Sequence, residues 1–179
     1  MIMSATFIPL ALNRLIARDE GFYTYAAKLL NQGKSLYIDF FFPQMPLSPY
    51  IYGAWMHLFG MTWDSGRTLS AIITALVGTL LFLYMRRRFS LTLAAAAVML
   101  FCSSNFVFPW YLNVRTYALS VLFMFGAFML LDTPSRKRNA TRALVAGLLF
   151  GLAIDTRLFF VGVLPFVALA LCLREESRK

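Results

Sequence analysis

Residues 66–88 read GRTLSAIITALVGTLLFLYMRRR, an apolar run that stops at three consecutive arginines. A bilayer-spanning helix needs about 20 predominantly apolar residues, and basic residues gather at the cytoplasmic ends of such helices. The stretch from Gly66 to Met85 therefore predicts a transmembrane helix that ends at Arg86.

The composition of the whole chain agrees with a membrane protein. Of its 179 residues, 60% are hydrophobic and 14% are charged, whereas a soluble domain has about 45–50% apolar and about 25% charged residues. This composition excludes a soluble enzyme, a nucleic-acid module and a disordered tail. The net charge of +9 indicates cytoplasmic loops beside anionic lipid, and no nucleic-acid partner is expected.

Further apolar runs lie on both sides of this helix. Residues 90–108 and 113–131 each have the length of one crossing, and residues 143–173 are too long for one and are broken at Asp155-Thr156-Arg157. Residues 1–18 predict a first span that is truncated or tilted, because their apolar part is short and contains a proline. We expect an all-α, polytopic transmembrane helical bundle of about five spans, forming a single membrane-embedded module.

The charged residues predict how this bundle is oriented. With four crossings after Gly66, most of the positive charge falls on one side, in residues 86–88, 136–142 and 174–179. Five of the eight acidic residues fall on the other side, and these are Asp19, Glu20, Asp39, Asp64 and Asp155. Positive charge marks cytoplasmic loops. Residues 19–64 are therefore predicted to form an extracytoplasmic loop, and residues 174–179 a cytoplasmic tail.

This loop mixes aromatic and polar residues with prolines, and it predicts two short helices. Asp19 can cap a helix whose apolar residues recur at three- and four-residue spacing, and Gly33 can end it. Residues 49–59 predict a second helix that is too short to cross a bilayer. Both are expected to be extracytoplasmic interfacial helices that lie on the membrane.

Three carboxylates of this loop are candidates for chemistry. Asp19 and Glu20 stand where the chain leaves the bilayer, and a partly desolvated carboxylate there can act as a general base. The alternative is a helix cap with a solvated neighbour. Asp39, in the aromatic run YIDFFFP of residues 37–43, is either a second carboxylate of the site or a turn residue.

Arg67, Arg115 and Arg157 each lie at the outer end of a predicted span. Cationic groups at this depth are costly unless they are paired or bind an anion. They can hold a phosphate or diphosphate while the carboxylates handle a proton or a metal, or they can form structural pairs with aspartates. The single histidine, His57, supports neither a metal site nor a catalytic triad.

The order of these features resembles the membrane-embedded glycosyltransferases of the GT-C class, in particular the protein O-mannosyltransferases and the lipid A aminoarabinose transferases. Asp19-Glu20 resembles the acidic pair that opens that group's first extracytoplasmic loop. Residues 39–50, DFFFPQMPLSPY, resemble its aromatic, proline-rich stretch, and residues 66–71, GRTLSA, resemble its arginine-bearing start of a span. Asp155-Thr156-Arg157 falls where the family has a Thr-Lys or Thr-Arg pair.

The resemblance implies an inverting transfer of a sugar from a polyprenyl-phosphate-linked donor to an extracytoplasmic acceptor, which is a lipid, a glycan or a protein. It implies that Asp19 is the base or positions the acceptor, with Glu20 beside it. The implied candidates are Arg67, Arg115 and Arg157 for the donor phosphate, and Asp39 and Tyr117 for substrate binding.

The chain differs from this family in two respects. Many relatives carry a further acidic residue near residues 113–117, where this chain has the uncharged Asn113 and Thr116. The resemblance therefore names no certain cofactor and leaves a divalent metal ion open. Relatives are also longer, so the chain is expected to be the N-terminal portion of a longer enzyme.

The expected partners are the polyprenyl-phosphate sugar donor and membrane lipids. The expected location is a bacterial or archaeal cell membrane, with the active site on the extracytoplasmic side. The alternative is a non-catalytic membrane protein, such as a transporter fragment or an assembly partner for other helices. Transporters place polar residues and broken helices near the bilayer midplane. Here the carboxylates gather in an outer loop, which favours an enzyme.

Overall fold

The computed structural model describes residues 2–13, 18–105, 107–132 and 140–167, and it is all-helical in these residues. The elements are α1 (Ile2–Leu12), α2 (Arg18–Asn31), α3 (Leu47–Phe59), α4 (Trp63–Arg86), α5 (Leu91–Ser103), the π-helical turn η1 (Val107–Tyr111), α6 (Thr116–Leu131), α7 (Ala140–Thr156) and the 3-10 turn η2 (Leu158–Val163). The predicted all-α class is thus confirmed. The predicted cytoplasmic tail, residues 174–179, lies outside the described residues.

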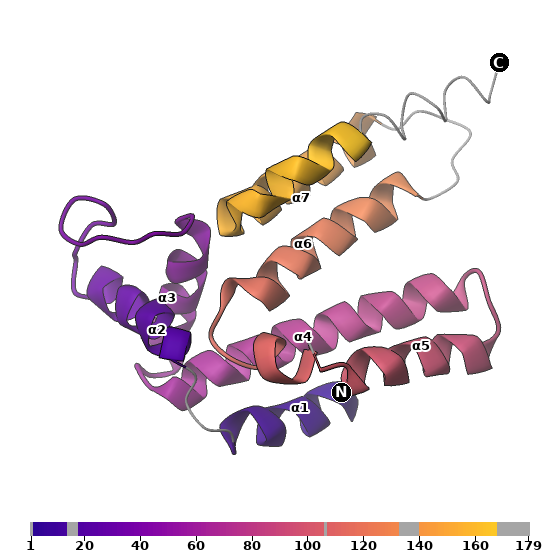
Figure 1. Ribbon diagram of the computed structural model, residues 1–179, viewed down its shortest axis with the longest axis horizontal. Coiled ribbons are helices and arrows are strands. Elements are labelled where there is room, and N and C mark those ends of the chain that lie inside the picture. Colours follow the sequence, from indigo (N-terminus) through magenta and orange to yellow (C-terminus); the bar gives the residue numbers. More distant parts are fainter. Residues whose placement is uncertain (1, 14–17, 106, 133–139, 168–179) are drawn as a thin grey trace.

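Helix α4 is the central element of the fold. The Thr62 hydroxyl accepts a hydrogen bond from the backbone N–H of Ser65 and caps its first turn. At 24 residues it is about 36 Å long. Among the described helices it is the one long and apolar enough to cross a membrane. Helices α1 and α5 pack on one side of it and α6 on the other (Figure 1).

The segment expected to form one helix over residues 90–108 is divided in the structure. Helix α5 ends at Ser103, the next residue is extended, and η1 follows. Pro109 accounts for part of this, because proline donates no hydrogen bond and its ring clashes with the preceding helical turn. Helix α5 is therefore only about 20 Å long, shorter than the span that the sequence predicted.

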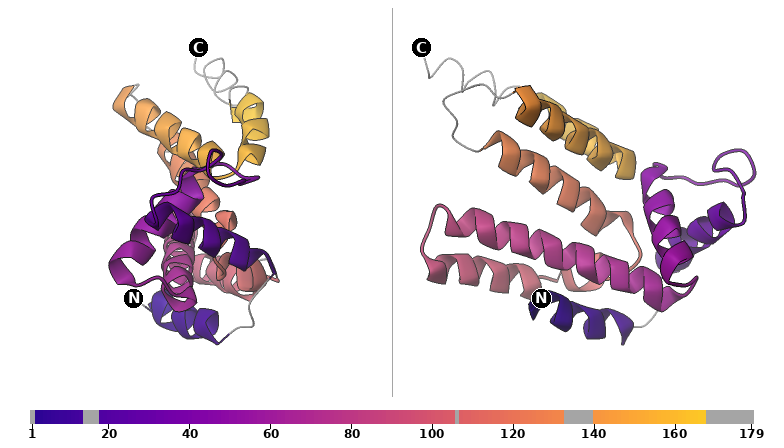
Figure 2. Two further views of the ribbon diagram at one scale, coloured as in Figure 1. Left: turned by 90° about the vertical axis from the view of Figure 1, so that its left-hand side faces the viewer. Right: turned by 180° about the vertical axis from the view of Figure 1, so that it is seen from behind.

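Helices α6 and α7 form an antiparallel pair outside α4, so that the bundle is layered (Figure 2). Ala127 of α6 packs against Ala146 and Phe150 of α7. The predicted break at residues 155–157 is confirmed: α7 ends at Thr156, Arg157 is extended with φ −154° and ψ 108°, and η2 begins at Leu158. The start of α6 and the end of α7 lie at the end of the bundle where α2 and α3 pack (Figure 1).

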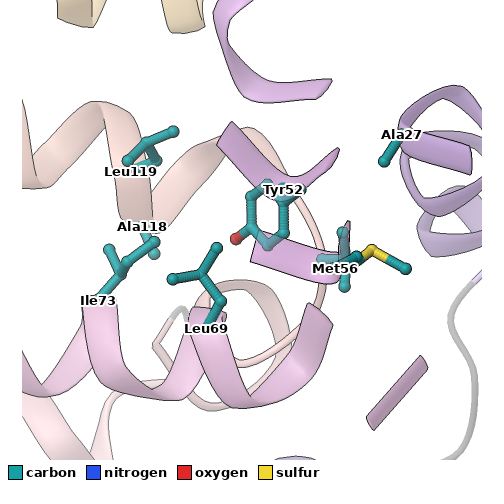
Figure 3. Close-up of a cluster of buried hydrophobic side chains, with 8 residues drawn as sticks. Ala27, Tyr52, Met56, Leu69, Ile73, Ala118 and Leu119 are labelled. Atoms are coloured by element: carbon teal, nitrogen blue, oxygen red, sulfur yellow. The ribbon is translucent and has the colours of Figure 1, made fainter. Parts of the chain in front are cut away.

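The helices predicted near residues 19–33 and 49–59 are present as α2 and α3, and they pack against each other at one end of α4. Gly33, at φ +80°, ends α2 in the left-handed conformation that glycine adopts without strain. From α3, the ring of Tyr52 inserts between α4 and α6 (Figure 3). It contacts a buried cluster that includes Leu69, Ile73 and Leu119. This contact fixes the pair α2–α3 to the bundle.

The opposite end of the bundle carries basic residues. The α4–α5 turn, the end of α6 and the start of α7 lie there, far from α2 and α3 (Figure 1). Arg88 forms an ion pair with Asp132, and the Tyr84 hydroxyl donates to the same carboxylate at 2.9 Å. The guanidinium of Arg88 also lies 4.3 Å from the centre of the Tyr84 ring. The two ends of the molecule therefore differ in chemistry as the charge pattern predicted. The basic residues 136–138 lie outside the described part of the chain.

Candidate active site

Asp19 and Glu20 lie in the first turn of α2, and each forms an ion pair with one of the predicted arginines. Glu20 binds Arg67 through two contacts, Arg67 Nε to Glu20 Oε1 at 2.9 Å and Arg67 Nη2 to Glu20 Oε2 at 2.7 Å. The two side chains are 0% and 3% exposed. This is the bidentate, charge-assisted geometry that a guanidinium and a carboxylate favour.

The Glu20–Arg67 pair joins four parts of the chain. Glu20 Oε1 also accepts the backbone N–H of Val114 at 3.1 Å, just before α6. Arg67 Nη1 donates to the backbone carbonyl of Ala11, at the end of α1, at 3.2 Å. Both charges are thus compensated by several hydrogen bonds, which a buried ion pair needs in order to offset its desolvation. The pair fixes α1, α2, α4 and the start of α6 relative to one another.

The Asp19–Arg115 pair is of a different kind. Arg115 Nη2 lies 3.2 Å from Asp19 Oδ2, and the side chains are 8% and 63% exposed respectively. The Arg115 guanidinium also lies over the ring of Trp110, 4.3 Å from its centre. Its Nε–H is buried and has no hydrogen-bond partner among the described residues. The Arg115 guanidinium is thus buried, with one of its faces on the Trp110 ring, while the carboxylate of Asp19 is open to solvent.

Arg157 lies beside the same cluster. Its guanidinium is 4.0 Å from the centre of the Tyr117 ring, and its Nη1 is 3.5 Å from the Thr116 hydroxyl. Tyr117 in turn packs edge-on against Trp110, with the ring centres 5.5 Å apart. The two aromatic rings that carry Arg115 and Arg157 are therefore in contact, and this brings both cations to the first turn of α6.

Tyr23 completes this cluster from α2. Burial raises the pKa of its phenol, although the charge of Arg157 and a hydrogen bond with Thr116 act to lower it. Tyr117 and Asp19 also act electrostatically on the pKa of Tyr23. A neutral, half-buried hydroxyl therefore lies within electrostatic range of the acid of α2 and the cation that follows α7. The sequence analysis did not identify Tyr23, and an aromatic residue four positions after an acidic residue is too common a pattern to signal it.

A row of polar side chains on α4 supports the segment that carries Arg115. Ser70 Oγ donates to the backbone carbonyl of Asn113 at 2.9 Å, and Thr74 Oγ1 donates to that of Tyr111 at 3.1 Å. The Tyr52 hydroxyl lies 2.8 Å from Ser70 Oγ. These contacts satisfy irregular backbone at the level of the spans, where an unpaired carbonyl is costly. Ser70 and Thr74 were not predicted, although polar residues four apart in an apolar span are the available signal.

Asp39 is not brought into this cluster. It is exposed, and its Oδ2 accepts the backbone N–H of Ser35 at 2.7 Å, which closes a tight turn that places Tyr37 at φ +67°. Burial, together with the charge of Asp155, raises the pKa of Tyr37. Of the predicted site residues, the structure therefore gathers Asp19, Glu20, the arginines and Tyr117, and it leaves Asp39 in a turn of the α2–α3 loop.

The described residues offer no group of three or more His, Cys, Asp or Glu side chains that could hold a metal ion. Asp19 and Glu20 are already engaged by arginines. The divalent metal that the sequence left open therefore has no ligand set in this part of the chain, and no chemical step is assigned to one.

The fold and the cluster define an all-helical protein with a cation-rich aromatic site at one end of its bundle. Over residues 43–179, the chain matches the family described as dolichyl-phosphate-mannose-protein mannosyltransferase. Because this match covers more than half of the chain, the protein belongs to that family. The match includes the three predicted arginines and Tyr117, whereas Asp19, Glu20 and Asp39 precede it. No curated protein and no solved structure matches the chain.

Proposed function

We propose that the protein transfers a sugar, mannose by its family, from a polyprenyl-phosphate donor to an acceptor hydroxyl on the extracytoplasmic side of a membrane. The observation that carries this proposal is the cluster in which Arg115 and Arg157 lie on two touching aromatic rings beside the exposed carboxylate of Asp19. It combines a site for an anion with a base at the end of the bundle opposite the basic turns. Family membership supplies the class of reaction.

The donor phosphate is assigned to Arg115 and Arg157. Both guanidinium groups lie on an aromatic face, which leaves their edges for hydrogen bonds to phosphate oxygens. Tyr117 supplies the ring beneath Arg157. Arg67, the third predicted arginine, is engaged by Glu20 and by the backbone carbonyl of Ala11. We therefore assign Glu20 and Arg67 the role of positioning residues for α2 and for the start of α6.

In the proposed reaction, the acceptor hydroxyl oxygen attacks the anomeric carbon of the donor. The bond between that carbon and the phosphate oxygen breaks, its electron pair leaves with the polyprenyl phosphate, and the configuration is inverted. Asp19 takes the proton of the attacking hydroxyl. Arg115 and Arg157 stabilise the negative charge that develops on the leaving phosphate, and this is the usual electrostatic contribution to such a transfer. The neutral phenol of Tyr23 is placed to donate a hydrogen bond at the same site.

The first prediction concerns Asp19→Asn in the intact protein in native membranes, assayed with dolichyl-phosphate-[³H]mannose. We expect transfer to fall by roughly 10²–10⁴-fold, which is the usual contribution of a general base, with normal protein levels. Asp64→Asn, in the first turn of α4, removes the same charge at the same end and is expected to retain transfer. Full activity of Asp19→Asn would exclude Asp19 as the base. An inactive wild-type protein that binds no donor would favour the non-catalytic alternative.

A further inference from the structure

We propose that Asp19 is the resting counter-ion of Arg115, that the donor phosphate displaces it, and that this displacement frees Asp19 to act as the base. The inference rests on the proposed function and assigns a regulation to its site. The exchange makes the base more available when the donor is bound. No covalent bond changes in this step: one anion replaces another at Arg115.

The first observation is the contrast between the two adjacent acid–arginine pairs. Glu20 and Arg67 share two short contacts, are buried together, and have additional backbone partners. Asp19 and Arg115 share a contact of 3.2 Å, and 63% of the Asp19 side chain is exposed. A pair with one exposed member is weakly held. Asp19 can therefore rotate into solvent, whereas Glu20 cannot leave Arg67 without abandoning a buried charge.

The second observation is that Arg115 has unused capacity for an anion. Its buried Nε–H has no hydrogen-bond partner in the described part of the chain, and a guanidinium offers five N–H donors. Arg115 is also the N-cap of α6, and no side chain caps that end of the helix or places a negative charge in its first turn. The start of a helix favours a bound phosphate. Asp19 alone does not satisfy this site.

The exchange changes the surroundings of Asp19 as well as those of Arg115. While Asp19 is paired with Arg115, its carboxylate oxygen Oδ2 is engaged by the guanidinium. When a donor phosphate occupies Arg115, the carboxylate loses that partner and lies beside a negative charge. The oxygen that Arg115 held is then available to the hydroxyl of an acceptor. Donor binding therefore comes first, and release of Asp19 as the base follows it.

The experiment measures the affinity of dolichyl phosphate for the purified intact protein in detergent micelles at fixed ionic strength. The proteins to compare are the wild type, Asp19→Asn and Asp19→Ala, and Asp64→Asn is the charge-matched control. Asp64 forms no ion pair with Arg115 among the described residues. We expect both Asp19 variants to bind the phosphate about fivefold more tightly than Asp64→Asn, because they remove a competing partner worth up to that factor. When Arg115→Gln is also present, the Asp19 and Asp64 variants are expected to bind dolichyl phosphate with equal affinity.

Equal or weaker binding by the Asp19 variants, relative to Asp64→Asn, would overturn the exchange. Two results separate this proposal from the proposed function. Loss of transfer in Asp19→Asn without tighter phosphate binding leaves Asp19 as the base and removes the exchange. Tighter binding, together with a wild-type protein that transfers no sugar, keeps the exchange and removes the catalytic assignment. The Asp19→Ala variant guards against an effect specific to the asparagine side chain.

Discussion

Asp19 and Glu20 are consecutive residues, yet their carboxylates meet opposite environments. The side chain of Glu20 points into the bundle, where Arg67 and the backbone N–H of Val114 bind it. That of Asp19 lies at the surface and touches Arg115. Two consecutive residues of the same helical turn thus provide a positioning acid and a chemically available one. This difference is the reason for assigning structural stability to Glu20 and reactivity to Asp19.

Glu20→Gln is predicted to destabilise the folded protein strongly. The substitution leaves the Arg67 guanidinium buried without its negative partner, a change that typically costs about 3–5 kcal/mol. Asp19→Asn, which opens a half-exposed pair, is expected to cost less than about 1 kcal/mol. Unfolding of both variants with sodium dodecyl sulfate, in mixed micelles, measures the difference. If Glu20→Gln unfolds like Asp19→Asn, the buried pair is not what holds α1, α2 and α4 together.

At the residue scale the sequence identified the charged groups but not their partners. Arg67, Arg115 and Arg157 looked equivalent, because each lies at the outer end of an apolar run. The distinction depends on pairing across 47 and 94 residues, from Glu20 to Arg67 and to Val114. Separations of that size are set by how helices pack and leave no periodic signal. Asp39 is a different case, because its partner is local: its carboxylate accepts the backbone N–H of Ser35 and closes a turn, one of the two alternatives that the sequence left open.

At the element scale, α4 and the segment before α6 approach closely at Gly66. A Cβ atom added at Gly66 would lie 2.7 Å from Val114 Cγ2, closer than real Cβ contacts allow. Val114 has a branched, stiff side chain and directly precedes Arg115. The absence of a side chain at residue 66 thus sets the position of the backbone that carries Arg115, the cation proposed to bind the donor.

Gly66→Ala is therefore predicted to weaken the site through its geometry. We expect a loss of about 1–3 kcal/mol in stability from overpacking, together with several-fold weaker binding of dolichyl phosphate, because Val114 and Arg115 must shift. Gly147→Ala in α7 is the matched control, since nothing lies within 4 Å of its added Cβ. It should leave phosphate binding unchanged and should not lower stability, because alanine favours a helix interior over glycine. Equal behaviour of the two variants in unfolding and binding measurements would show that Val114 moves aside freely.

The elements themselves were largely predictable, because their signals are local. The end of α2 at Gly33 and the break after Thr156 follow from a glycine and a polar interruption in the sequence. The start of α2 was expected at Asp19 as the cap, whereas the helix begins at Arg18 and Asp19 lies in its first turn. The region from Ser104 to Arg115 was not predictable. Its irregular backbone is stabilised by Ser70 and Thr74 of α4, and those partners become visible only when the two segments are placed side by side.

At the scale of the whole molecule, the chain has two chemically distinct ends. The site lies at the end formed by α2 and α3, and the basic turn after α4 lies at the other (Figure 1). If the bundle spans the membrane as proposed, these ends face opposite compartments. The positive charge at residues 86–88 predicts that this end faces the cytoplasm.

This orientation is testable with single cysteines at the two ends. The natural cysteines at positions 102 and 172 are first replaced by alanine, and Lys34→Cys or Arg87→Cys is then introduced, both at exposed positions. A membrane-impermeant maleimide is expected to label the cysteine at position 34 in intact cells, and the one at position 87 only after permeabilisation. Labelling of both from the same side would contradict the proposed topology.

The hydroxyl groups that α4 offers to residues 111 and 113 also bear on how the chain is inserted during synthesis. The ribosome completes α4 before it makes η1 and α6. A backbone carbonyl that enters hydrocarbon without a partner costs several kcal/mol, so the irregular segment can leave the insertion machinery only against a helix that is already in place. Ser70 and Thr74 provide that surface in advance. For this segment the order along the chain is therefore also an order of assembly, because residues 111 and 113 are made after the hydroxyl groups that satisfy them.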